Sequence, residues 1–74
     1  MNKPTINKKA SSLKIAQKMQ QMNITTKEMA KDLNTSYQMI WKYTHNRAFP
    51  SVKRLYIIAK ILNCNMEDLL VENN

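Results

Sequence analysis

Apolar residues recur every three or four positions along most of the chain, which is the spacing of one face of an α-helix. The first such set is Ile15, Met19 and Met22. Either Ser11 or Ser12 is able to cap the helix that contains this set, and Asn23 stops it. No segment alternates apolar and polar residues for long enough to form a β-strand. The pattern therefore predicts an all-α fold.

Capping residues mark where the next two helices begin. Thr25 and Glu28 form a capping box, in which each side chain accepts a hydrogen bond from the other residue's backbone, so a second helix runs from there to Leu33. Either Thr35 or Ser36 caps a third helix. The side chains that these two helices should bury are Met29, Ala30, Leu33, Met39, Ile40 and Tyr43.

A fourth and a fifth helix complete the predicted fold. Ser51 opens the fourth, and residues 65–68 start a short fifth. Their apolar faces are predicted to consist of Val52, Leu55, Ile58, Ala59, Leu62, Met66, Leu69 and Leu70. We therefore expect a single domain of five helices over residues 11–72, which is as much as a chain of 74 residues holds.

Residues 1–10 are polar and are predicted to form a flexible basic arm. This segment contains Pro4 and three lysines, Lys3, Lys8 and Lys9. Two interpretations remain open for it. The arm either contacts phosphate groups or is a tail without a function of its own.

The chain contains no glycine, which is the residue that most often ends a helix in a left-handed backbone conformation. Asparagine is the usual second choice, because it tolerates positive φ better than most residues. Four asparagines fall where predicted helices end, and they are Asn23, Asn34, Asn46 and Asn63. We expect these four residues to take the place of glycine.

Residues 25–44 carry the most specific pattern of the chain. Two short helices are joined by a three-residue turn at Asn34, and the small Ala30 lets the second helix cross close to the first. Ile40 then follows at the spacing of an inward-facing residue. This arrangement predicts a helix-turn-helix, the motif that places its second helix in a DNA groove.

Charge is distributed unevenly along the chain, whose net charge is +7. Residues 1–60 hold all twelve Lys and Arg against Glu28 and Asp32, a net charge of +10, whereas residues 61–74 hold three acids and no base, a net charge of −3. A basic body on so small a domain favours a polyanionic partner. A basic protein without such a partner is the alternative.

Catalytic and metal-binding chemistry is not predicted. The chain has one His, one Cys and five acidic residues, and no two of them have a convincing nucleophile–base or metal-ligand spacing. A domain of this size leaves little surplus stability for a deep catalytic cleft. We therefore expect no enzyme activity, no cofactor and no metal.

Cys64 is alone, so it forms no intramolecular disulfide, and its apolar surroundings predict a buried thiol. A single reduced cysteine fits a cytoplasmic location. No apolar stretch has membrane-spanning length, and no signal-peptide pattern is present.

One side of the third helix should remain exposed. At about 100° per residue, the residues opposite its buried face are Tyr37, Gln38, Trp41, Lys42 and His45. Gln38 suits bidentate pairing with adenine, and Lys42 suits guanine or a phosphate. Tyr37 and Trp41 suit thymine methyl groups or sugars. The alternative for Trp41 is packing on a neighbouring helix or in a dimer contact.

Helix ends supply the predicted phosphate contacts. Thr25, Thr26 and Lys27 lie at the start of the second helix, where free N–H groups and the helix dipole favour an anion. Asn46 and Arg47 follow the third helix and are placed to reach the opposite DNA strand. We expect His45 to lie at the surface or to contact a phosphate.

From about Leu13 to Leu70, the chain resembles the Cro/cI-like (XRE-type) family of phage-repressor helix-turn-helix proteins. The matching residues are Asn23-Ile24-Thr25, Glu28-Met29-Ala30, Leu33-Asn34, Ser36, Ile40, Tyr43, Asn46-Arg47, Pro50-Ser51, Leu55, Ile58-Ala59-Lys60, Leu62 and Asp68-Leu69-Leu70. The resemblance implies a lambda-repressor-like domain of five helices that binds a pseudo-palindromic operator in double-stranded DNA as a homodimer.

The resemblance also implies roles for particular residues. It places base reading on Ser36, Tyr37, Gln38, Trp41 and Lys42. It places phosphate contacts on Thr25, Thr26, His45 and Arg47. It puts the dimer surface near the fourth and fifth helices, where Tyr56, Ile57 and Ile61 either form the contact or widen the core face.

The chain departs from the family pattern at several positions. Thr26 stands where Gln is usual, Asn34 where Gly is usual, and Trp41 where a small residue is usual. Many members pair an Arg of the first helix with a Glu near the end of the third, and here these positions are Met19 and Thr44. Both charges are absent together, so no unpaired charge is left buried.

Two functions are compatible with these observations. The first is a sequence-specific transcriptional regulator, a small homodimeric repressor that reads the major groove with its third helix and is encoded by a bacterium or a phage. The second is a protein-interaction module on the same fold, an antitoxin or antirepressor that buries Tyr37 and Trp41 against another protein.

Overall fold

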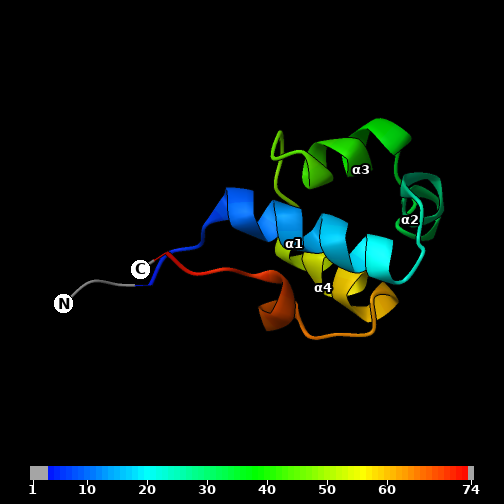
Figure 1. Cartoon of the computed structure of the whole chain (residues 1–74). Helices are drawn as coiled ribbons and strands as arrows, with labels where there is room; N and C mark the ends of the chain where they lie inside the picture. The colour runs from blue at the N-terminus through cyan, green and yellow to red at the C-terminus, as the bar shows by residue number, and fades with distance from the viewer. Residues whose placement is uncertain (1–3, 74) are drawn as a thin grey trace.

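The computed structural model describes residues 4–73, which form four α-helices and one turn of 3₁₀-helix (Figure 1). The elements are α1 (Lys8–Gln21), α2 (Thr26–Asp32), α3 (Tyr37–Thr44), α4 (Val52–Ile61) and the 3₁₀ turn η1 (Met66–Leu69). No strand occurs within the described residues. The predicted all-α fold is confirmed, but the predicted fifth helix is only a single 3₁₀ turn.

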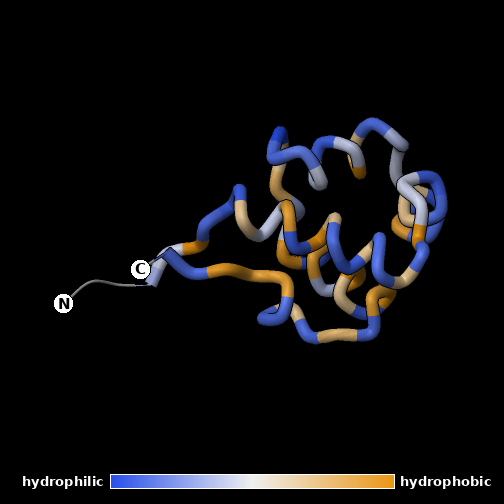
Figure 2. The backbone as a smooth tube through the Cα atoms, in the orientation of Figure 1, coloured by the Kyte–Doolittle hydropathy of each residue, from blue (hydrophilic) through white to orange (hydrophobic). Residues whose placement is uncertain are grey.

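The hydrophobic core lies where the four α-helices and η1 face one another (Figure 2). Its buried members are Ile15, Met19, Met29, Ala30, Leu33, Ile40, Tyr43, Leu55, Ile58, Ala59, Leu62 and Leu69. Two predicted core residues are instead exposed, Met22 at 44% and Val52 at 75%. Met22 follows the last turn of α1, and Val52 begins α4, where side chains lean past the helix end.

The predicted helix caps of α2, α3 and α4 are confirmed by their hydrogen bonds. The Thr25 N–H donates to Glu28 Oε1 at 3.0 Å, and the Glu28 N–H donates to Thr25 Oγ1 at 3.1 Å. Ser36, rather than Thr35, caps α3 by accepting from the Met39 N–H. The Ser51 side chain caps α4 in the same way.

The start of α1 differs from the prediction. The helix begins at Lys8, because Asn7 caps it by accepting a hydrogen bond from the Ala10 N–H at 3.0 Å. Ser11 and Ser12 are therefore not caps but lie within α1, at 0% and 1% exposure. The predicted boundary between residues 10 and 11 falls inside this helix.

Residues 5–7, also predicted to belong to the arm, pair with residues 71–73. The Asn7 N–H donates to the Val71 carbonyl at 2.7 Å, and the Asn73 N–H donates to the Thr5 carbonyl at 2.9 Å. This short antiparallel pairing brings both ends of the described chain together at one end of the molecule (Figure 1). Residues 1–3 of the predicted arm, Lys3 included, lie outside the described residues.

All four helix-ending asparagines have a left-handed backbone, as the sequence predicts. Their φ angles are 57° at Asn23, 55° at Asn34, 56° at Asn46 and 56° at Asn63. Because an asparagine side chain is short and polar, the left-handed conformation is less unfavourable for it than for most residues. The chain thus ends four helices without any glycine.

Candidate nucleic-acid interface

The helix-turn-helix consists of α2, α3 and the turn between them. Ala30 is 5% exposed, so α3 crosses close to it, and the Ala30 carbonyl accepts a hydrogen bond from the Thr35 N–H at 2.9 Å. The Asn34 N–H donates to the Lys31 carbonyl at 3.1 Å. These bonds close the turn and fix the direction in which α3 leaves α2.

The outer face of α3 is exposed along its whole length. Its residues are the five predicted ones, Tyr37, Gln38, Trp41, Lys42 and His45. Tyr37 is 55% exposed and Trp41 41% exposed, whereas Ile40 and Tyr43 on the opposite face are 1% and 5% exposed. Exposed aromatic side chains on a small domain indicate a surface that another molecule covers.

Trp41 does not enter the core. Its ring stacks on the imidazole of His45, with ring centroids 4.1 Å apart and an angle of 13° between the planes. His45 Nδ1 also lies 2.7 Å from the Trp41 carbonyl oxygen. The stack and the hydrogen bond together restrict both side chains to one arrangement at the end of α3.

The bond to the Trp41 carbonyl decides which ring nitrogen of His45 carries the proton. A carbonyl oxygen only accepts hydrogen bonds, so Nδ1 is the donor and Nε2 of the neutral ring is an acceptor. A phosphate oxygen needs a donor. In the neutral ring, Nε2 therefore offers no donor to a phosphate oxygen.

Two hydroxyl groups of the predicted site also serve as helix caps. Ser36 Oγ accepts from the Met39 N–H at 3.1 Å, and Thr25 Oγ1 accepts from the Glu28 N–H at 3.1 Å. Both residues are exposed. Ser36 keeps its own O–H group as a donor, whereas the Thr25 side chain also hydrogen-bonds to the Glu28 carboxyl. Capping therefore fixes the position of the Ser36 donor without using it up.

An open groove of about 570 Å³ connects the start of α2 with the outer part of α3. Thr25, Thr26 and Lys27 line it from α2, and Tyr37 and His45 line it from the α3 side. The structure thus brings together four of the six predicted phosphate-contact residues. The N–H groups at the start of α2 and the ammonium group of Lys27 give this groove donors and positive charge.

Asn46 and Arg47, the other two predicted phosphate-contact residues, lie in the loop after α3 and are both exposed. The Arg47 N–H donates to the Lys42 carbonyl at 2.9 Å, and the Asn46 N–H donates to Ser12 Oγ at 3.0 Å. Their backbone is therefore held by α3 on one side and by α1 on the other.

Two residues that support α3 were missed by the sequence prediction. Arg54 Nη1 donates to the Tyr43 hydroxyl at 2.9 Å and links α4 to α3, and Ser12 links α1 to the end of α3. Ser12 was interpreted as a cap. The missed signal was its spacing, since Ser12 precedes Ile15 by three residues and Met19 by seven, which places it on the buried face.

Other chemistry is sparse in this part of the chain. Residues 4–73 contain no group of three or more His, Cys, Asp or Glu side chains placed to hold a metal ion. None of the described helices is both long and apolar enough to cross a membrane. Burial raises the pKa of the half-buried Cys64 thiol, which disfavours the reactive thiolate.

Comparison with known proteins agrees with this geometry. Residues 14–73 match a family model whose description is Cro/C1-type HTH DNA-binding domain. That span includes every residue of the exposed face of α3 and of the groove beside it. No curated protein matches the chain.

Proposed function

Because the chain belongs to the Cro/C1-type helix-turn-helix DNA-binding domain family, we propose that it is a sequence-specific transcriptional repressor that binds double-stranded DNA as a homodimer. The observation that carries this proposal is the exposed face of α3, which presents two aromatic rings, an amide and an amine to solvent. These groups match what base edges in the major groove offer.

In this proposal, the base-reading residues act from α3 and its cap. Gln38 pairs with adenine through its amide, and Lys42 donates to guanine. Tyr37 and Trp41 pack against thymine methyl groups or sugars. Ser36 donates its free O–H group from the start of the helix.

Phosphate contacts then orient α3 in the groove without reading sequence. Thr25, Thr26 and Lys27 hold one DNA strand at the start of α2, and His45 lies in the same groove. Asn46 and Arg47 hold a phosphate from the loop after α3. The net charge of +7 adds a general attraction to DNA.

The proposed homodimer forms through the surface around α4 and η1, so that two copies of α3 meet a pseudo-palindromic operator. Tyr56 is 51% exposed on α4, with the Lys60 ammonium 5.3 Å from its ring centroid. Ile57 and Ile61 pack against the core. Tyr56 is therefore the residue of this group that we place in the dimer contact.

The exposed Tyr37 and Trp41 also favour a second candidate function. A protein partner with an acidic, apolar groove would bury the same two rings, as expected of an antitoxin or antirepressor. The two candidates differ in one measurable property. The repressor must select a DNA sequence, whereas a protein-interaction module need not, although an antitoxin is also able to bind its own promoter.

The test is selection of binding sites from a random duplex library, with the wild-type protein and with Gln38→Ala/Lys42→Ala. We expect the wild type to enrich an inverted repeat and the double variant to lose it. Arg47→Ala should weaken binding to every sequence alike and lower the salt dependence of log K by about one unit of slope.

Lys53→Ala is the matched control, because it removes the same charge from an exposed residue to which the proposal gives neither a DNA contact nor a place in the dimer contact. It should leave the enriched sequence unchanged. Absence of any enriched sequence with the wild type, together with only salt-sensitive background binding, would contradict the repressor and favour the protein-interaction module.

A further inference from the structure

The ends of the four α-helices share one hydrogen-bond pattern. In each, the N–H after the left-handed asparagine donates to the carbonyl five residues back, at 2.9 Å. These bonds are Ile24 to Met19, Thr35 to Ala30, Arg47 to Lys42 and Cys64 to Ala59. This is the longer of the two bonds of the Schellman motif that ends many helices.

The second bond of the motif is direct at three of the four ends. The N–H of the asparagine itself donates to the carbonyl three residues back, at 3.1 Å each time. These bonds are Asn23 to Gln20, Asn34 to Lys31 and Asn63 to Lys60. The helices α1, α2 and α4 therefore close their own ends.

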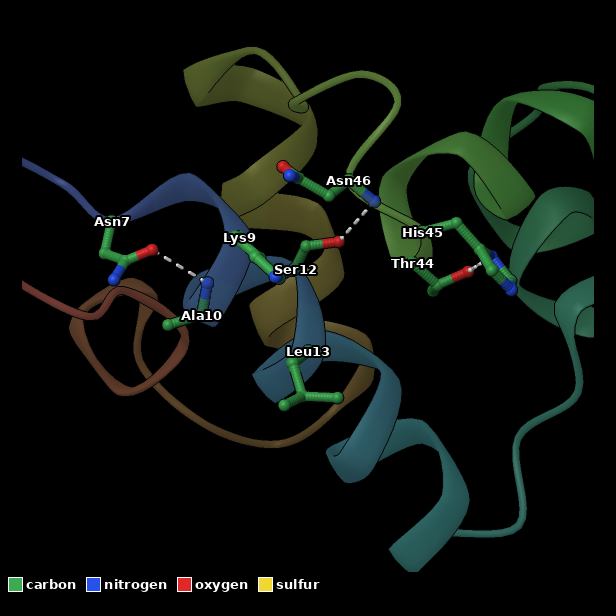
Figure 3. Close-up of a pocket in the computed structure, with 8 residues that line it drawn as sticks. All are labelled: Asn7, Lys9, Ala10, Ser12, Leu13, Thr44, His45 and Asn46. Carbon is green, nitrogen blue, oxygen red and sulfur yellow. Dashed lines mark hydrogen bonds between the residues drawn. The ribbon is translucent and has the colours of Figure 1, made fainter.

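The end of α3 is closed by a side chain from another helix. The Asn46 N–H donates to Ser12 Oγ at 3.0 Å (Figure 3). The Ser12 hydroxyl donates in turn to the Tyr43 carbonyl, three residues before Asn46. We call this pair of bonds the Ser12 bridge. It occupies the place of the direct bond seen at the other three ends.

The preceding hydrogen bond of α3 is displaced as well. At the ends of α2 and α4, the N–H of Leu33 or Leu62 donates to the carbonyl four residues back, at 2.9 Å. The His45 N–H instead donates to the Lys42 carbonyl, three residues back, at 3.3 Å. The Trp41 carbonyl, four residues back, is bound by the His45 ring. The last turn of α3 thus ends in a 3₁₀-type bond, and the opening that Ser12 enters lies between the Asn46 N–H and the Tyr43 carbonyl.

Ser12 is well suited to hold this opening. It is 1% exposed and lies on α1, more than 30 residues from its partners along the chain. Its hydroxyl acts both as a donor and as an acceptor. A hydrogen bond of a buried hydroxyl is directional, so the position of α1 determines where the Asn46 backbone lies.

We propose that Ser12 is a positioning residue for DNA binding, which sets the place of Asn46 and Arg47 relative to α3 through the Ser12 bridge. This inference rests on the proposed function, in which Arg47 contacts a phosphate. Ser12 itself touches no DNA. Ser12 fixes the distance between the end of α3 and the guanidinium group of Arg47, which anchors α3 to the DNA backbone.

Loss of the hydroxyl is expected to move the loop rather than unfold the domain. Without Ser12, the Asn46 N–H is able to donate directly to the Tyr43 carbonyl, as the three other asparagines do to their own helices. The backbone hydrogen bond is then regained, and the last turn of α3 tightens. Arg47 shifts with Asn46, so a phosphate contact is lost while the fold persists.

The experiment compares Ser12→Ala with Ser11→Ala by titrating operator DNA at several salt concentrations. Ser11 is the neighbouring residue of α1 and is equally buried, but its hydroxyl accepts from the Val71 N–H at 2.8 Å, away from α3. We expect Ser12→Ala to weaken operator binding roughly tenfold, the worth of one hydrogen bond to a charged group. The slope of log K against log salt should fall by about one.

A double-mutant cycle identifies the route of the effect. In an Arg47→Ala background, Ser12→Ala should weaken binding little further, because the contact that it positions is already gone. Ser11→Ala should leave affinity and slope unchanged once corrected for the folded fraction. If Ser12→Ala does not fold, Ser12→Cys takes its place, because a thiol is of similar size and a much weaker hydrogen-bond partner.

The outcomes separate the two proposals. Wild-type protein that selects no operator would overturn the proposed function and, with it, this role of Ser12. Wild-type protein that binds its operator, with a Ser12→Ala variant of equal affinity and slope, would overturn the inference alone. Additive losses from Ser12→Ala and Arg47→Ala would also overturn it, because Ser12 would then act independently of Arg47.

Discussion

The helix-turn-helix and the region where α1 meets the two ends of the chain are stabilised by hydrogen bonds of very different range. In the helix-turn-helix, the capping bonds of Thr25, Glu28 and Ser36 join residues three apart. Around α1, the side chains of Ser11 and Ser12 bind groups 31 to 60 residues away. We call this second region the α1 seam, defined by residues 5–12, the loop after α3 and residues 71–73.

The difference shows how the proposed DNA-contacting surface is supported. One end of α3 is fixed by its own cap at Ser36, which forms as soon as the helix forms. The other end is fixed through the α1 seam, which exists only when the whole domain is folded. The start of α3 is therefore held by a cap from its own sequence neighbourhood, whereas its end is held by contacts with distant parts of the chain.

The largest effect is expected at Leu69, which anchors the C-terminal side of the α1 seam. Leu69 is fully buried in η1, which contacts α1 and α4. Leu69→Ala should lower the free energy of unfolding by about 2–5 kcal/mol, the range for truncating a buried leucine. Urea denaturation measures this loss. A change under about 1 kcal/mol would mean that residues 66–73 contribute little to the fold.

A smaller effect is expected at Ser11, which tests the hydrogen bonds of the seam themselves. Ser11→Ala leaves the Val71 N–H without its acceptor, and an unsatisfied backbone group costs about 1–3 kcal/mol. The Val71 amide should also exchange its hydrogen faster. The amides of residues 25–45 should keep their relative protection, and equal loss of protection there would show that the two regions are not separable.

The smallest effect is expected at Glu28 and tests the short-range hydrogen bonds of the helix-turn-helix. Hydrogen bonds from the Thr25 backbone N–H and from Thr25's side chain hold the pKa of the Glu28 carboxyl below its ordinary value of 4.5. The charged form of the carboxyl is therefore favoured by folding. Its stabilisation is fully present at neutral pH. It is lost as the pH falls below the ordinary pKa and through the lowered pKa of the folded protein.

Glu28→Gln should remove this pH dependence. The melting temperatures of the two proteins should differ most at neutral pH and converge as the pH becomes acidic. Because Glu28 lies at the surface, the difference should be small and should shrink further in salt. A difference that stays constant from neutral to acidic pH would assign the effect to something other than the carboxylate charge.

Much of the fold was predictable because it depends on local chemistry. The caps at Thr25, Ser36 and Ser51 and the four left-handed asparagines follow from the preferences of single residues. The buried and exposed faces of α3 follow from the helical spacing of its apolar and polar residues. The sequence also predicted all five residues that the outer face of α3 exposes to solvent.

The errors fall where local preferences compete. Ser11, Ser12 and Asn7 are all acceptable caps for α1, and nothing in their neighbourhood selects one of them. The choice is made by distant groups, because Val71 and the end of α3 bind the two serine hydroxyls and draw them into the interior. The arm assigned to residues 1–10 loses its last three residues to α1 for the same reason.

The sequence alone therefore determined that the fold is all-α, how α2, α3 and α4 begin, and which face of α3 is presented outward. These features depend on interactions between residues three or four apart, which the order of residues displays directly. The tertiary structure alone decided that Ser12 closes the end of α3 and that Ser11 holds the C-terminal segment. Bonds that join residues 31 to 60 positions apart have no periodic signature, so only the packed domain reveals them.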